Sequence, residues 1–219
     1  HAHLDKSLLI TPELLEKANT HMQEKWYLMR ELKVTYTSED LQNRMNKTVE
    51  KIVSQGCINI RSFIDIDNIV GLTCIEEACK LRENWSKKGV EIQLATQPLE
   101  GLMENGCSIE LFEKAAQMCD IVGGLPSRDG ERSDEHLDII FSTAKRLGKP
   151  VEAHLDQLNI PSEKETEQFC DFVEKYGFQG MARSVHSVSL ACKEIEEQKE
   201  IAKRLKSLDI GVIICPSAA

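Results

Sequence analysis

Two histidines near the start of the sequence, His1 and His3, are separated by a single residue. In an extended strand, residues two apart project from the same face, so both imidazoles can reach one metal ion. His154, much later in the chain, can supply a third nitrogen. Zinc, iron and related divalent ions favour such ligands, and catalytic sites keep one position open for water. A metal held in this way lowers the pKa of bound water to about 7, which makes hydrolysis the predicted chemistry.

Each of these histidines also has an ordinary structural interpretation. His1-Ala2-His3 matches the remainder of an affinity tag, and a free amino terminus followed by His3 chelates copper or nickel through backbone nitrogens. His154 is equally compatible with a hydrogen-bonded core residue, and His186 taken alone favours a packing role. Their positions relative to the predicted strands therefore carry the argument.

Short apolar segments alternate with longer amphipathic ones along the chain. The segments with the pattern of strands are 57–66, 90–95, 120–125, 150–154, 182–188 and 210–215, and residues 1–4 resemble the end of an earlier strand. The segments with the pattern of helices are 12–32, 38–55, 72–87, 108–118, 133–147, 162–176 and 194–208. This alternation predicts βαβ units and a parallel sheet.

The number of strands favours one α/β domain over residues 1–219, a (β/α)8 TIM barrel with strand 1 clipped and strand 8 absent. A doubly wound sheet is the alternative, but Gly123-Gly124 is too weak a match to its phosphate-binding loop. Active-site groups of a parallel barrel come from the carboxyl ends of its strands. The polar residues at the predicted strand ends are His1, His3, Asp65, Asp67, Gln97, His154, Asp156, Gln157 and His186.

Composition excludes several classes of function. The net charge of −9 argues against binding to nucleic acid or to an anionic membrane surface, both of which need clustered lysine and arginine. No apolar run approaches the roughly 20 residues that span a bilayer. The eight cysteines form no CxxC pair, so we expect reduced thiols in a cytoplasmic protein.

Several motifs resemble the amidohydrolase superfamily, in its cytosine deaminase-like branch. His1-Ala2-His3-Leu4-Asp5-Lys6 is similar to the first-strand HxHLDK/T motif. Segments 61–66, 97–102 and 122–126 are similar to the second, third and fourth strands of that branch. Segments 153–156 and 185–190 resemble its fifth-strand metal-ligand segment and its sixth-strand HxxSL motif. The resemblance extends along the whole chain.

The resemblance implies a metal-dependent hydrolase that acts on C–N bonds other than peptide bonds. Deamination or dealkylamination of a cyclic amidine or amide, such as a pyrimidine or triazine, is the expected reaction. The implied metal ligands are His1, His3 and His154, with His186 as the catalytic residue that contacts the attacking water or the substrate. No lysine ends the fourth strand, so one zinc or iron ion is expected rather than a pair bridged by a carboxylated lysine.

The expected partner is a small nitrogenous molecule, and family members commonly form homo-oligomers. The residues expected to bind this substrate are Lys6, Gln97, Asp156 and Gln157. Lys6 is shared with N-isopropylammelide isopropyl amidohydrolase, although a solvated charge after the strand is an equally good interpretation.

Three departures from the family pattern bear on the substrate. Gln157 stands where deaminases of this branch carry a proton-shuttling glutamate, and an amide cannot act as a general acid or base. When the third-strand segment is aligned by exact spacing, Leu99 rather than Gln97 stands at the position of the family's ring-binding glutamine. The eighth-strand aspartate is missing, because the sequence ends at Ala219, after the seventh strand. We therefore expect a portion of a larger enzyme, with a truncated or degenerate barrel that binds a metal or a partner as the alternative.

Overall fold

The computed structural model describes residues 1–19, 22–103 and 106–215. Six parallel strands form where the sequence predicts them. They are β1 (Asn59–Asp65), β2 (Glu91–Gln97), β3 (Val122–Gly124), β4 (Val151–Leu155), β5 (Ala182–His186) and β6 (Gly211–Ile213). Single parallel bridges from Ala2 to Ser62 and from Ala95 to Ile121 connect the opening segment to β1 and β2 to β3. The described residues thus form seven consecutive segments of a barrel that is not closed, as predicted.

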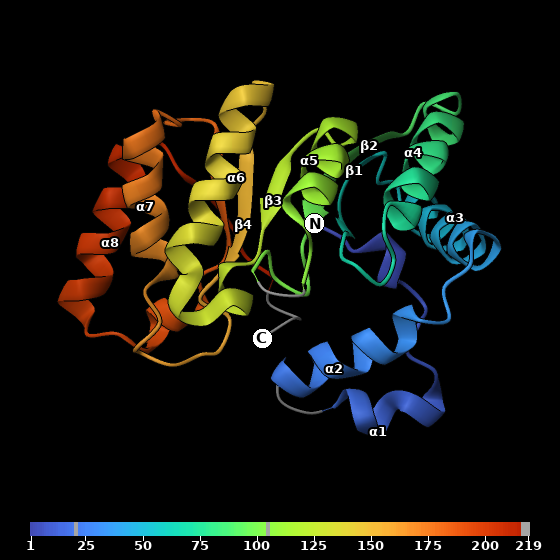
Figure 1. Cartoon of the computed structure of the whole chain (residues 1–219), viewed down its shortest axis with the longest axis horizontal. Helices are drawn as coiled ribbons and strands as arrows, with labels where there is room; N and C mark the ends of the chain where they lie inside the picture. Colours follow the sequence, from blue (N-terminus) through green and yellow to red (C-terminus); the bar gives the residue numbers. More distant parts are fainter. Residues whose placement is uncertain (20–21, 104–105, 216–219) are drawn as a thin grey trace.

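Helices on the outside of the sheet connect successive strands. They are α3 (Ser38–Ser54), α4 (Thr73–Ser86), α5 (Ile109–Met118), α6 (Ser133–Leu147), α7 (Glu165–Tyr176) and α8 (Ile195–Ser207). Figure 1 shows α6, α7 and α8 on one flank of the strands and α3 and α4 on the other. The Thr37 and Ser108 side chains cap α3 and α5, and Gly148 and Gly177 end α6 and α7 in the left-handed conformation. None of the described helices is long and apolar enough to cross a membrane.

The single helix predicted over residues 12–32 is wrong. The chain there forms a short 3-10 turn, η2 (Pro12–Leu14), followed by α1 (Leu15–Ala18) and α2 (Met22–Lys33). Asn19 leaves the helical region with a ψ of 65°, and asparagine competes for helical hydrogen bonds through its own side chain. Thr11, the expected cap, makes no capping hydrogen bond through its side chain. Figure 1 shows α1 and α2 apart from the other helices, below the ends of the strands.

The alternation of side chains along the strands creates two apolar layers. Outward-facing residues such as Ile64, Leu94 and Val151 pack beneath the helices in the main core. Inward-facing residues form a smaller cluster inside the sheet, made by Phe63, Ala95, Ile121 and Val185. A period of two residues therefore determines which residues of each strand can line the barrel interior.

Phe63 fills the barrel interior only because β3 has glycine beside it. A Cβ atom on Gly123 would lie 2.9 Å from the Phe63 ring and would overlap the carbonyl oxygen of Thr96. That carbonyl belongs to the backbone of β2 and cannot rotate away. Gly123 is thus a packing requirement of the interior, whereas a Cβ on Gly124 would meet Ile140 and His136 of α6 on the outer face of the strand.

We predict that Gly123→Ala destabilises the protein by about 2 kcal/mol or more, since overpacking a rigid interior forces the backbone to shift. Urea denaturation followed by circular dichroism measures the effect. Gly211→Ala is the matched control, because a Cβ there would meet only the flexible Arg183 side chain, at 3.2 Å. Equal stability of the two variants would contradict the proposed packing role of Gly123.

Candidate active site

Four histidines from distant parts of the sequence converge at the carboxyl ends of the strands. The Nε2 atoms of His1 and His3 lie 3.2 Å apart. The His154 ring centroid lies 5.2 Å from that of His1, 5.3 Å from His3 and 5.1 Å from His186. One ring nitrogen from each of His1, His3 and His154 lies within 4.8 Å of the other two. The sequence-predicted ligand set is therefore brought together.

The three imidazoles have the chemistry of a metal site. His154 is 2% exposed, and neither of its ring nitrogens has a hydrogen-bond partner among the described residues, although the backbone of Gly124 lies near the ring. The Nδ1 atom of His3 is also buried without a partner. Burial, and then the charge of Lys6, lowers the pKa of His3, and burial lowers the pKa of His154. Neutral imidazole is the form that binds a divalent cation, so the residues present fit such an ion.

A cavity of about 300 Å³ opens in front of the histidines. The fully buried Phe63 ring packs against these histidines and lies edge-on to His154, with the centroids 4.4 Å apart. The apolar walls of the cavity are Trp26, Met29, Leu99 and Leu125. Its polar walls are His1, His3, His154, His186, Lys6, Lys25, Gln97, Gln157 and Cys215. A cavity of this size and mixed character is suited to one small ring with polar edges.

The opening HxHLDK segment is fixed to the end of β1 by its own side chains and backbone. The amide of Leu4 donates to the Ser62 hydroxyl at 2.9 Å, and the amide of Asp65 donates to the Asp5 carboxylate at 2.9 Å. Arg44 of α3 donates to the backbone carbonyl of Asp5 at 2.6 Å. These contacts, together with the bridge between Ala2 and Ser62, hold the opening segment beside β1, and both His1 and His3 line the cavity.

Lys6 reaches the cavity as one member of a buried ion network. Its ammonium pairs with Asp65, which also pairs with Lys33 of α2 at 2.9 Å. Lys33 lies 2.5 Å from Asp67 and is 2% exposed. Burial opposes the charge of Lys33, but Asp65 and Asp67 outweigh burial and raise its pKa. The network thus anchors α2 over the mouth of the cavity and holds the Lys6 ammonium at its edge.

Gln97 and Gln157, two of the residues predicted to bind substrate, line the cavity. Gln97 is 2% exposed, and its Oε1 atom has no hydrogen-bond partner among the described residues. Gln157 makes a long contact of 3.5 Å to the Ser127 hydroxyl. Both amides are therefore available to a ligand, and Leu99 contributes an apolar wall beside them.

Asp156, also expected to contact substrate, lies outside the cavity. Its carboxylate accepts hydrogen bonds from the backbone amide of Glu165 at 2.9 Å and from the Thr166 hydroxyl at 2.5 Å, at the start of α7. The reason is the backbone turn after β4, where Asp156 has a φ of 51°. We therefore correct its assignment: Asp156 connects the strand that carries His154 to α7.

His186 ends β5 in a strained backbone conformation. Its φ is 75° and that of Ser187 is 52°, a region that residues with a Cβ seldom adopt. The loop that follows is tied down by Ser189, which donates to the Glu163 carboxylate and accepts from the amide of Ile160 at 3.1 Å. The serine of the HxxSL segment therefore has a structural role. Burial lowers the pKa of His186, which favours its neutral form.

Several residues of the site were not predicted from the sequence, among them Lys25, Trp26 and Met29 of α2. Trp26 closes the cavity from α2, and Lys33 anchors that helix, but neither stands in a pattern that marks a site. Cys215 could have been found, because it follows β6 at the same end of the sheet as the histidines. The remaining histidines differ: His136 is buried in α6 and accepts from the amide of Leu125 at 3.0 Å, and His21 lies outside the described residues.

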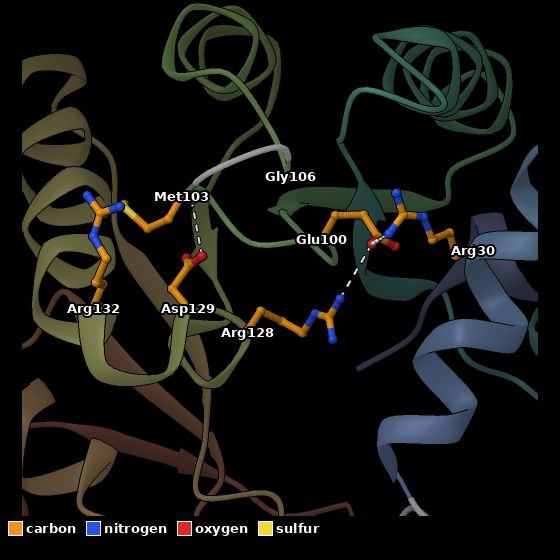
Figure 2. A pocket seen from close by; sticks show the side chains of 7 residues that line it. All are labelled: Arg30, Glu100, Met103, Gly106, Arg128, Asp129 and Arg132. Carbon is orange, nitrogen blue, oxygen red and sulfur yellow. Dashed lines mark hydrogen bonds and ion pairs between the residues drawn. The ribbon is translucent and has the colours of Figure 1, made fainter.

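A second cavity, of about 350 Å³, lies on the other side of Trp26. The Arg128 guanidinium stacks over the Trp26 ring, 4.5 Å from its centroid, and separates the two cavities. Figure 2 shows Arg30 and Arg128 both extending toward Glu100, which Arg128 reaches at 3.4 Å. Asp129 accepts from the backbone amide of Met103 at 3.1 Å. Glu100 thus pairs with both Arg30 of α2 and Arg128, and these ion pairs brace α2 at this cavity.

Comparison with curated proteins finds a relative in Haemophilus influenzae, an uncharacterized protein. The two are 35% identical over 222 aligned residues, which include all of this chain and 80% of that protein. The chain belongs to the same family as this Haemophilus protein. No model of a known protein family matches the chain.

Solved structures establish the fold. The 5-methylcytosine deaminase of Klebsiella pneumoniae, solved with phosphonocytosine, aligns with 99% of this chain at a TM-score of 0.91 and 22% identity. N-isopropylammelide isopropylaminohydrolase of Burkholderia multivorans aligns with 98% of it at a TM-score of 0.79 and 21% identity. The chain spans about half the length of each, 53% and 54% respectively. The incomplete (β/α)8 barrel predicted from the sequence is confirmed as the fold.

The contact between β4 and α7 makes stability depend on pH. Glu165 accepts a hydrogen bond from the amide of Asp156 at 2.8 Å, and burial raises its pKa from 4.5 to about 8. The folded protein therefore holds this proton more tightly than the unfolded chain does. The stabilising contribution is complete below about pH 4.5 and is lost as the pH rises through about 8.

We predict that Glu165→Gln reduces this loss, because the amide still accepts the hydrogen bond and carries no charge. Each pKa unit corresponds to about 1.4 kcal/mol. The free energy of unfolding of the wild type should therefore fall by several kcal/mol between about pH 5 and about pH 9. Urea denaturation at both values measures it. Glu174→Gln, on the exposed side of α7, is the control. Identical pH dependence in the wild type and in Glu165→Gln would refute the assignment.

Proposed function

We propose that the protein is a metal-dependent hydrolase that cleaves a C–N bond in a small cyclic amidine or amide. The observation that supports it most directly is the convergence of ring nitrogens from His1, His3 and His154. Both ring nitrogens of His154 and the Nδ1 atom of His3 are buried without hydrogen-bond partners among the described residues. These three residues would hold one divalent cation, zinc or iron. When bound, such a cation supplies Lewis-acid activation of water and of the scissile group.

The remaining polar groups of the cavity would bind and orient the substrate. Gln97 can accept a hydrogen bond at Oε1 from an N–H group on the edge of a ring. Lys6, held by Asp65, can donate from Nζ to a ring nitrogen or carbonyl oxygen. His186, whose neutral imidazole lies beside His154, can stabilise negative charge that develops on the attacked carbon's oxygen.

The apolar walls favour a planar substrate. Trp26, Met29, Leu99 and Leu125 enclose the side of the cavity opposite the histidines and would exclude bulk water from a bound ring. A pyrimidine or a triazine has the required size and alternates donor and acceptor atoms along its edge. The structures that share this fold support the same class, since one is a 5-methylcytosine deaminase and another an N-isopropylammelide isopropylaminohydrolase.

We predict that His154→Ala lowers metal affinity and kcat/KM by more than about 100-fold. Changes to the residues that support a metal ligand already lower these quantities by about 10- to 100-fold, and loss of the ligand itself should have a larger effect. Metal content after dialysis and hydrolysis of a panel of aminopyrimidines and aminotriazines measure both. His136→Gln, a buried histidine outside the cavity, should keep its metal. Metal binding with no hydrolysis of any compound in the panel would favour the alternative of a non-catalytic barrel.

The proton-transfer step can be tested at Gln157, which lines the cavity. A carboxylate there can carry a proton to a leaving amine, and general acid–base catalysis contributes about 100-fold or more in rate. We therefore predict that Gln157→Glu raises kcat for deamination at least about tenfold. Steady-state kinetics measures the change, and Gln157→Asn is the control. A Gln157→Glu rate at or below that of the wild type would mean that another group already transfers this proton.

A further inference from the structure

Cys215 lies beside two of the histidines in the cavity. Its Sγ atom, a ring nitrogen of His1 and a ring nitrogen of His186 all lie within 4.8 Å of one another. All eight cysteines of the chain are free thiols, and of these Cys215 is the one that lines this cavity. The mouth of the barrel therefore presents two overlapping sets of ligand atoms, which share His1.

The position of Cys215 follows from the alternation of the sheet. Ile213 in β6 pairs with Val185 in β5, and both belong to the cluster inside the barrel. Cys215 comes two residues after Ile213 and packs against the same interior cluster. It therefore occupies the next inward-facing position toward the mouth, close to His186 at the end of the neighbouring strand.

The chemistry of this second set differs from that of the first. The first set has three imidazoles, whereas the second combines two imidazoles with a sulfur atom. Thiolate ligands favour zinc, cadmium and other thiophilic cations and bind magnesium, calcium and manganese poorly. Two imidazoles and one thiolate leave a fourth position of a tetrahedral zinc site open.

We propose that His1, His186 and Cys215 form a binding position for a thiophilic divalent cation, beside the proposed catalytic position and sharing His1 with it. The inference rests on the proposed function for the role of the first position, but the second depends only on the three residues that form it. Binding would form a sulfur–metal bond and release the thiol proton to solvent. The site would thereby select zinc or cadmium over harder cations.

The experiment is a cobalt titration of the metal-free full chain, in a phosphine reductant. Cobalt is preferred to copper or nickel, which a free amino terminus with His3 can chelate. A cobalt–thiolate bond absorbs in the near ultraviolet, whereas the visible bands report cobalt bound by any ligands. We expect the ultraviolet band in the wild type and in Cys57→Ser, an exposed cysteine control. We expect the ultraviolet band to be lost in Cys215→Ser and in Cys215→Ala. When cadmium competes with cobalt, these two variants should bind cadmium at least tenfold more weakly than the wild type.

Further variants separate the two positions. His186→Ala should lose the ultraviolet band, whereas His3→Ala should keep it, and excess magnesium should not displace the cobalt. Visible bands without an ultraviolet band in the wild type, or a band that persists in Cys215→Ser, would overturn the inference and leave the proposed function standing. An ultraviolet band together with unchanged metal binding in His154→Ala would count against the proposed function and support the thiolate position. No cobalt binding in the wild type would overturn both.

Discussion

Buried imidazoles without hydrogen-bond partners are the feature on which the rest of this structure depends. An unsatisfied buried polar atom destabilises a protein by about 1–3 kcal/mol, and His154 alone has two such atoms. The surroundings hold these rings in place through packing and through the backbone. The Phe63 ring supports His154 from below, and Gly123 leaves room for that ring. The site is therefore preorganised, and a cation at this position would satisfy the atoms that the protein leaves unpaired.

The structure around the site shows how parallel strands convert sequence separation into proximity. His1, His154 and His186 belong to three strand ends far apart in the chain. Different side-chain hydrogen bonds to the backbone fix these ends. The HxHLDK segment uses Asp5 to bind the amide of Asp65. The end of β4 uses Asp156 to cap α7. Each contact is a single hydrogen bond, and together these bonds determine how the distant histidines are placed relative to one another.

The α2 helix adds a second kind of support, through charge. Lys33 places an ammonium between Asp65 and Asp67 in the interior, where an unpaired charge would be strongly destabilising. The same Asp65 holds Lys6 at the edge of the cavity. The position of α2, which supplies Trp26 and Met29 to the cavity wall, is therefore coupled to the position of the Lys6 ammonium at the cavity edge. Pairing of Arg128 with both Trp26 and Glu100 reinforces this arrangement from outside.

The sequence alone determined the strands, the alternation with helices and the end of the sheet at which His1, His3, His154 and His186 would meet. These features follow from local periodicity and from the direction of parallel strands, both of which are encoded over a few residues. The tertiary structure alone decided that Asp156 turns away to cap α7, that residues 12–32 break into separate helices, and that Trp26, Lys33 and Cys215 belong to the site. The reason is physical: a backbone turn, a buried charge and a shared cavity depend on which distant segments come into contact, and no local pattern records those contacts.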